Sequence, residues 1–455
     1  MQSQNLRSGG VMAEWHVPEE WLRRFLKHVT SREETRRIVR HLLHGCSLCS
    51  ALSQRLTAEQ EATATVADYE QLFRDVELFG SRAAARHAVE KVRGWAQWAA
   101  LEELPPAERE ARVRPDERVH THGFYKRLLD ASLWRGRSEP AEAVDIVKLA
   151  ILVAELVEPA RVGGEPAKID LQAAAWAILG NARRLASDFA GARAALDEAW
   201  RLNALGTREP LERAQLLSLE ASWMISMGEF ERAEALLEEA VLLHRAAGNL
   251  HQQGRVLLKM GVAIGYVQPE RGIAHIENAL TLIDRATEPR LDLCAQHALA
   301  HCLSEAGRPQ QALAVLDAAR PLYKQFSDDH TQLRLHWLEG RIARQLGHSA
   351  EAVDIFRQMR EEFRVRDLHH ETLLVSIDLA EAYVAAGEPE LAARLVAELV
   401  PIIVRWGLHR DALSAWSILQ DALELRRAEG LFGALQEYFR RHWVKPGTFE
   451  PGPLH

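Results

Sequence analysis

A short pattern of small residues that returns roughly every 40 residues between Ala173 and Trp406 limits this chain to one kind of architecture. Each copy has a small residue midway along one amphipathic stretch, then a turn glycine, then a small residue early in a second stretch. The five clear copies read Leu179-Gly180…Ala192…Ala199, Ala221…Gly228…Ala233…Ala240, Ala300…Gly307…Ala312…Ala319, Gly340…Gly347…Ala352 and Ala380-x2-Tyr383…Gly387…Ala392. Helices that cross closely need small side chains at the crossing, and a glycine after a helix adopts the left-handed conformation easily. The pattern therefore predicts an all-α stack of helical hairpins, each burying its apolar face against its neighbours.

The repeats also divide the chain into segments. A divergent copy over 118–157, with Gly136 at its turn, and a weak copy over 254–286 extend the stack. The expected segments are a disordered leader (1–14), a compact helical hairpin with a His/Cys cluster at one end (15–50), a helical connector and linker (51–117), the repeats (118–406), two capping helices (407–445) and a tail (446–455). Charge and proline at 104–115 predict a linker or an exposed loop, and paired glycines within 160–168 predict another loop. No convincing stretch alternates with period two, so we expect essentially no β-sheet.

Composition and charge restrict the class of protein. The apolar fraction of 47% and the charged fraction of 26% are typical of a soluble folded chain. The net charge of −8 and the scattered basic residues argue against general nucleic-acid binding. No apolar run reaches the roughly 18 residues of a membrane span, and the first residues lack the apolar core of a secretory signal. Four cysteines in 455 residues do not make a disulfide framework. We therefore predict a cytoplasmic protein with reduced thiols, whose translation can begin at Met1 or Met12.

The segment 15–50 has the local signals of two short helices. Pro18 suits the first position of a helix, where the missing N–H breaks no hydrogen bond. Ser31 and Glu34 form the capping box that opens a second helix, which the sequence ends at Gly45. An antiparallel arrangement of these two helices brings their open ends together.

Four potential metal ligands lie at that open end. His16 and His41 become neighbours in the hairpin, and Cys46 and Cys49 follow directly, with His44 as a reserve ligand. Two imidazoles and a Cys-x2-Cys pair suit tetrahedral zinc. We therefore predict one Zn²⁺ bound by His16, His41, Cys46 and Cys49; the alternative is a helix that ends in two buried cysteines without metal.

The repeats resemble the tetratricopeptide family over roughly half to two-thirds of the chain. Trp337-x2-Gly340 and Ala380-x2-Tyr383 are similar to the pattern of the family's first helix, although each unit is about six residues longer than the usual 34. The resemblance implies a right-handed superhelix whose concave groove binds a partner protein or peptide.

The N-terminal segment resembles the zinc-associated anti-sigma fold, whose motif places a first ligand some 25 residues before His-x3-Cys-x2-Cys. Here His16 lies 25 residues before His41, and the spacing to Cys46 is one residue longer than in that motif. The resemblance implies that this segment binds a sigma factor.

Several side chains fall on the groove side of the repeats in the family's alignment. They are Asn181, Arg184, His297, His301, Arg334, Trp337, Arg341 and Arg344. Arginine offers a fixed fork of donors and tryptophan a flat apolar face, so we expect an acidic or carboxylate-bearing partner. The alternative is that Trp337 packs between repeats and the arginines pair with nearby acids; the sequence leaves both open. Cys294 and Cys302 share a helix with the two histidines, where groove lining is favoured over a metal site.

The chain lacks the sequence motifs of metalloproteases, serine hydrolases, phosphate-binding loops and dinucleotide-binding folds. The leading hypothesis is a scaffold or adaptor with a regulatory role that recognises a partner protein or peptide and catalyses no reaction. The second is a zinc-dependent, anti-sigma-like transcription regulator. The third is an enzyme of unrecognised type.

Overall fold

The computed structural model describes residues 16–26, 29–43, 46–61, 89–136, 138–265, 267–405, 416, 419, 431–442, 447 and 449. Within these residues every element is a helix and there is no strand, which confirms the all-α prediction. The expected leader 1–14 and His44 lie outside the described residues. The chain divides into two compact units, Met1–Trp223 with Glu239–Leu250 and Met224–Glu238 with His251–His455. No helix in the described part is long and apolar enough to cross a membrane.

The N-terminal segment folds as three helices. They are α1 (Glu19–Leu26), α2 (Arg32–Leu43) and α3 (Ser47–Glu61). The capping box is confirmed at the start of α2, because the Glu34 N–H donates to Ser31 Oγ at 3.2 Å and the Ser31 N–H donates to Glu34 Oε2 at 2.8 Å. Leu56 of α3 is buried with Leu22 and Ile38, so the core of this module continues past the expected boundary at residue 50.

The rest of the first unit packs its helices in sequence order. Residues 89–99 are helical and are followed by α5 (Pro106–Val113), a short 3₁₀ turn (Glu117–Val119), α6 (His122–Arg135), α7 (Pro140–Leu156), α8 (Pro159–Val162), α9 (Glu165–Leu185) and α10 (Phe189–Asn203). The loop predicted at 104–115 is wrong, because Pro106 starts a helix that buries Arg109 and Val113 four residues apart. The loop predicted at 160–168 is confirmed only at Gly163 and Gly164, whose positive φ separates α8 from α9. It is shorter than expected, because Pro166 lies in the first turn of α9.

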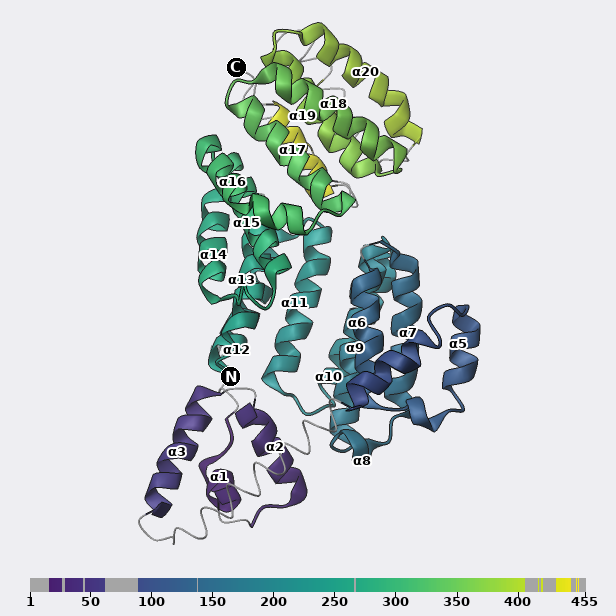
Figure 1. Cartoon of the computed structure of the whole chain (residues 1–455), viewed down its shortest axis with the longest axis vertical. Coiled ribbons are helices and arrows are strands. Elements are labelled where there is room, and N and C mark those ends of the chain that lie inside the picture. The colour runs from purple at the N-terminus through teal and green to yellow at the C-terminus, as the bar shows by residue number, and fades with distance from the viewer. Residues whose placement is uncertain are drawn as a thin grey trace, which may run out of the picture. The chain divides into compact units, whose positions relative to one another are not determined.

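The helices that follow form the remaining repeats. They are α11 (Pro210–Ser226), α12 (Phe230–Ala246), α13 (Leu250–Gly265), α14 (Pro269–Leu282), α15 (Pro289–Glu305), α16 (Pro309–Gln325), α17 (Asp329–Gln345), α18 (Ser349–Val365), α19 (His369–Ala385) and α20 (Pro389–Arg405). From α14 to α20 each helix packs against the next (Figure 1). Helix α17, the first helix of its repeat, also contacts α15 and α19, the first helices of the repeats before and after it. We call the surface that these three helices share the inner face.

The small residues of the repeat pattern lie at helix crossings. Ala300, Ala312 and Ala352 are completely buried. A Cβ atom on Gly340 would lie 2.7 Å from the Phe356 ring, which explains the glycine at that crossing. Gly347, in the turn between α17 and α18, has φ of +87°, a left-handed conformation that favours glycine. The crossings and turns are those that the sequence predicts.

The last described helix, α22 (Leu431–His442), was expected to cap the open end of the stack. Trp416 does lie against the final repeat, where its indole N–H donates to the Val396 carbonyl at 2.8 Å. Helix α22 packs on α19 and sends its polar side chains to the inner face. The other expected capping helix lies almost entirely outside the described residues, so the capping role stays a prediction.

Candidate functional site

The four expected metal ligands converge in the N-terminal module. His16 precedes α1, His41 lies in α2, Cys46 precedes α3 and Cys49 lies in its first turn. Their ligand atoms all lie within 4.8 Å of one another, and both cysteines are buried. Burial raises the pKa of the Cys49 thiol to about 11, so the thiolate forms readily only beside a cation. The cluster can hold a metal ion.

The cysteines and histidines of α15 (Cys294, His297, His301 and Cys302) do not bring their ligand atoms together as a candidate metal site within the described residues. His297 Nδ1 lies 2.8 Å from the Tyr323 hydroxyl and belongs to a buried hydrogen bond. Cys294 is exposed, whereas Cys302 is buried, and burial raises the pKa of its thiol to about 12. His297 and Cys302 are therefore buried, and only Cys294 of these three residues is exposed as a groove lining would be.

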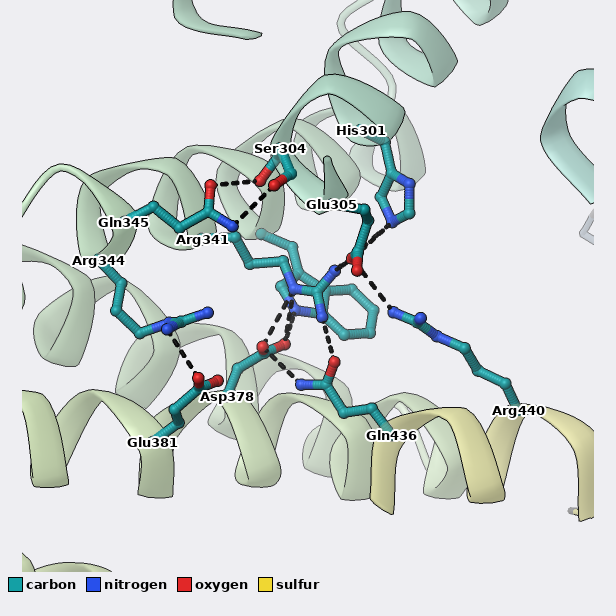
Figure 2. Close-up of polar contacts among 11 residues, drawn as sticks. His301, Ser304, Glu305, Arg341, Arg344, Gln345, Asp378, Glu381, Gln436 and Arg440 are labelled. Atoms are coloured by element: carbon teal, nitrogen blue, oxygen red, sulfur yellow. Dashed lines mark hydrogen bonds and ion pairs between the residues drawn. The ribbon is translucent and has the colours of Figure 1, made fainter. Parts of the chain in front are cut away.

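Arg341 is the centre of a polar cluster on the inner face (Figure 2). Its side chain is only 9% exposed, and its guanidinium pairs with Asp378 Oδ1 of α19 at 3.0 Å and with Glu305 of α15. Asp378 is fully buried. Burial opposes the charge on the guanidinium, but the two carboxylates raise the pKa of Arg341 above its ordinary value. Three successive repeats therefore meet at one buried cation.

Trp337 and Arg344 complete the contacts of α17 with α19. The Trp337 indole N–H donates to Asp378 Oδ2 at 2.7 Å, and its ring meets Phe363 edge-on at 5.4 Å between centroids. Arg344 Nη1 pairs with Glu381 Oε1 at 2.8 Å. These contacts agree with the alternative in which the tryptophan packs between repeats and the arginines pair with acids. Arg341 is thus not a solvated groove residue.

Helix α22 supplies the remaining partners of the cluster (Figure 2). Gln436 is buried; its Oε1 accepts a hydrogen bond from Arg341 Nη2, and its Nε2 donates to Asp378 Oδ1 at 2.7 Å. Arg440, four residues later, lies 3.5 Å from Glu305 Oε1. We call Glu305, Arg341, Asp378, Gln436 and Arg440 the inner-face cluster.

The electrostatics of His301 and Glu305 are set by this cluster. Burial lowers the pKa of His301 to about 3, with Arg341, Arg440 and Arg334 acting in the same direction and Glu305 opposing them. Burial alone would raise the pKa of Glu305, but Arg341, His301 and Arg440 lower it to about 2. Near neutral pH the pair is a neutral imidazole beside a carboxylate.

These shifts predict that the second unit loses stability as the pH falls. The unfolded chain takes up a proton on His301 near its ordinary pKa of 6.5, whereas the folded chain does so only near 3, so this stability is complete above pH 6.5 and is lost towards pH 3. Glu305 adds a further loss of stability as the pH falls from 4.5 to 2, because its pKa is lower in the folded chain than in the unfolded chain. Urea unfolding from pH 7 to pH 4 should show the decline. His301→Gln should reduce the slope between pH 6.5 and 4.5; an unchanged slope would contradict the assignment.

The other expected groove residues are not members of the inner-face cluster. Arg334 is exposed and forms no ion pair with the described residues. It precedes Arg341 by two helical turns, about 10 Å along α17. Asn181 and Arg184 lie together on α9 in the first unit, where the Arg184 guanidinium donates to Asn181 Oδ1 at 3.0 Å.

Sequence analysis missed Glu305, Asp378, Gln436 and Arg440. Asp378 had a signal, because it is an isolated acid within the apolar run Leu373–Leu379 of a first helix. Buried acids need a partner, so its repeat position should have pointed to Arg341. Gln436 and Arg440 share a helix face, but nothing local shows which surface that face meets.

Comparisons with known proteins support the repeat architecture. Residues 291–363, which span α15 to α18, match the family model described as tetratricopeptide repeat. A search of curated proteins found no match. A solved structure with a similar fold is that of a Rap protein complexed with competence and sporulation factor, with a TM-score of 0.51, 13% identity and coverage of 70% of this chain and 94% of that chain. Aspartyl phosphate phosphatase F from Bacillus subtilis gives a TM-score of 0.48 and 13% identity, with coverage of 86% and 95%.

The first likeness shows the fold, a helical superhelix of tetratricopeptide type. The family match does not extend to the N-terminal module, so the anti-sigma resemblance stays a hypothesis.

Proposed function

We propose that this chain is a regulatory scaffold or adaptor that binds a segment of a partner protein on the inner face of its repeats. The observation that carries the proposal is the convergence of side chains from α15, α17 and α19 on one point of that face. Buried ion pairs contribute little net stability compared with packed apolar side chains. Because these charged side chains come from three repeats, their placement favours a role in recognising a partner over a role in stabilising the stack. The solved complex of a Rap protein with competence and sporulation factor supports the proposal that this type of fold binds a partner.

The partner should also contact Arg334, which is exposed on α17 and forms no ion pair with the described residues, so it is available to an acidic group. We expect Arg334→Ala to weaken partner binding roughly tenfold, which corresponds to about 1.4 kcal/mol. Thermal stability should not change, because an exposed side chain without an ion pair contributes little. The experiment is affinity purification from the native host, identification of the captured protein, and titration of that protein against the variant.

A matched control is Arg364→Ala on the second helix α18, where the arginine is exposed and pairs with its neighbour Glu361. It should leave binding and stability unchanged. Equal binding by the wild type and Arg334→Ala would remove Arg334 from the interface, and capture of no partner by the wild type would contradict the scaffold itself.

A second candidate function rests on the His/Cys cluster, which we propose as a zinc site. Tetrahedral zinc with ordinary bond lengths separates its sulfur and nitrogen ligands by about 3.5 Å. His16 Nδ1 lies 3.5 Å from Cys46 Sγ and 3.7 Å from Cys49 Sγ, which suits one zinc ion. Together with the anti-sigma resemblance, this geometry supports a zinc-dependent transcription regulator. Capture of a sigma factor by the wild type, but not by Cys46→Ser/Cys49→Ser, would favour this second function.

A further inference from the structure

Helix α22 fits the inner face as a bound ligand would. The Gln436 carboxamide uses its oxygen towards Arg341 and its amide N–H towards Asp378, so both ends of the group are matched. One turn later the Arg440 guanidinium lies beside Glu305. A carboxamide and a cation four residues apart on one helix are therefore recognised by two acids and one arginine from three repeats.

The apolar side of α22 has the spacing of a helix laid in a groove. Leu431, Leu435 and Phe439, each four residues apart, are almost completely buried. Phe439 meets the Trp416 ring at 6.2 Å between centroids. Apolar anchors at this spacing, with a few polar contacts that fix the register, define the helix-in-groove mode of recognition.

The far end of α22 lies against the turn that precedes α12. A Cβ atom on Gly228 would lie 2.3 Å from the Arg441 carbonyl oxygen, so a glycine is needed for this approach. The Arg441 guanidinium lies over the Phe230 ring at 5.1 Å and near Glu231 at 3.5 Å. The helix thus contacts α19, α15 and the start of α12.

We propose that α22 is a resident ligand of the inner face, and that the partner is a helical segment bearing a carboxamide and a cation one turn apart, which replaces α22. This inference rests on the proposed function and adds to it the chemistry of the partner and a self-occupied site. The twelve residues of α22 are too few to form a stable isolated helix, so its release is coupled to its unfolding. Binding of the partner then requires that α22 opens without the rest of the stack.

Hydrogen exchange on the full chain tests this opening. The amides of 431–442 should exchange at least about tenfold faster than those of α19, because a local opening requires less free energy than global unfolding. Gly228→Ala should accelerate exchange in 431–442, whereas Gly387→Ala should not. The two glycines are matched: φ is +73° at Gly228 and +79° at Gly387, but a Cβ atom at Gly387 meets nothing within 4 Å. Exchange of α22 at the rate of α19 in all three proteins would overturn the proposal.

Competition tests the chemistry of the partner. The probe is a fluorescent peptide of residues 431–442, titrated by anisotropy into the full-length wild type and Gln436→Ala/Arg440→Ala. The variant should bind the peptide about tenfold more tightly than the wild type, because its own helix competes less. A peptide with the same two substitutions should bind about tenfold more weakly than the parent peptide. Equal affinities of the two proteins, or of the two peptides, would contradict the proposal.

These outcomes are separable from failure of the proposed function. Capture of a partner, and its dependence on Arg334, can be measured whether or not α22 moves. Partner binding that is weakened by Arg334→Ala but unchanged by Gln436→Ala/Arg440→Ala would support the scaffold function and contradict the proposal that α22 is a resident ligand. Fast hydrogen exchange in α22 together with capture of no partner would support the opening of α22 and contradict the scaffold function.

Discussion

Removal of metal from the N-terminal module should unfold residues 16–61 while the repeats stay folded. Among the described residues, the core of this module contains six buried residues, two of which are the proposed ligands Cys46 and Cys49. A module of this size rarely buries enough apolar surface to fold alone, whereas structural zinc contributes about 10–16 kcal/mol in small zinc-binding peptides. Protein purified under reducing conditions should contain about one zinc per chain. After chelation, hydrogen exchange should accelerate in 16–61 and stay unchanged in α15–α20.

Cys46→Ser/Cys49→Ser should reproduce the effect of chelation, because it removes both thiolates. Cys294→Ser is the matched control, since Cys294 is exposed and lies far along the chain from the cluster. It should retain the zinc and the protected module. Metal-free wild-type protein with unchanged exchange in 16–61 would show that the two cysteines are simply buried core residues.

The stack of repeats could be predicted from the sequence because its signals are local. Alanines at 0% exposure mark the helix crossings, as Ala312 and Ala352 show, and glycines with positive φ mark the turns. Both signals recur within one repeat. They fix the order of helices and the residues that face a neighbour, and they need no knowledge of distant segments.

The His/Cys cluster was predicted for a related reason. Its ligands belong to one short hairpin, so helix lengths alone bring His16 near Cys46. The third helix was missed because the apolar residues of α3, including Leu56, are spread over a polar segment with little amphipathic contrast.

The inner-face cluster could be predicted only in part. The sequence placed Arg341 on the correct helix face, but its partners Glu305 and Asp378 lie 36 and 37 residues away. Gln436 is 95 residues away. A local pattern cannot show that a C-terminal helix returns to the inner face, so the sequence could not distinguish a solvated arginine from a buried one.

That burial makes Asp378 the position where one substitution should destabilise the second unit most. Asp378→Ala removes the carboxylate that faces the Arg341 guanidinium and that accepts hydrogen bonds from Trp337 and Gln436. The cation then stays in a site that is only 9% exposed, with Glu305 as its remaining acid. Removal of one partner of a buried ion pair costs about 3–5 kcal/mol, so the free energy of unfolding should fall by about that amount in urea titrations.

Two controls separate the buried charge from the general effect of losing an acid. Asp354→Ala removes a carboxylate that is 79% exposed on α18, and it should leave the free energy of unfolding unchanged. Arg341→Leu/Asp378→Leu removes both charges together and should be less destabilising than Asp378→Ala, because no uncompensated cation remains. A double variant that is as unstable as the sum of its two single variants would show that the two side chains act independently. In that case Arg341 and Asp378 would not form an energetically coupled ion pair. The proposal that this pair recognises α22 as a ligand would then lose its main polar contact.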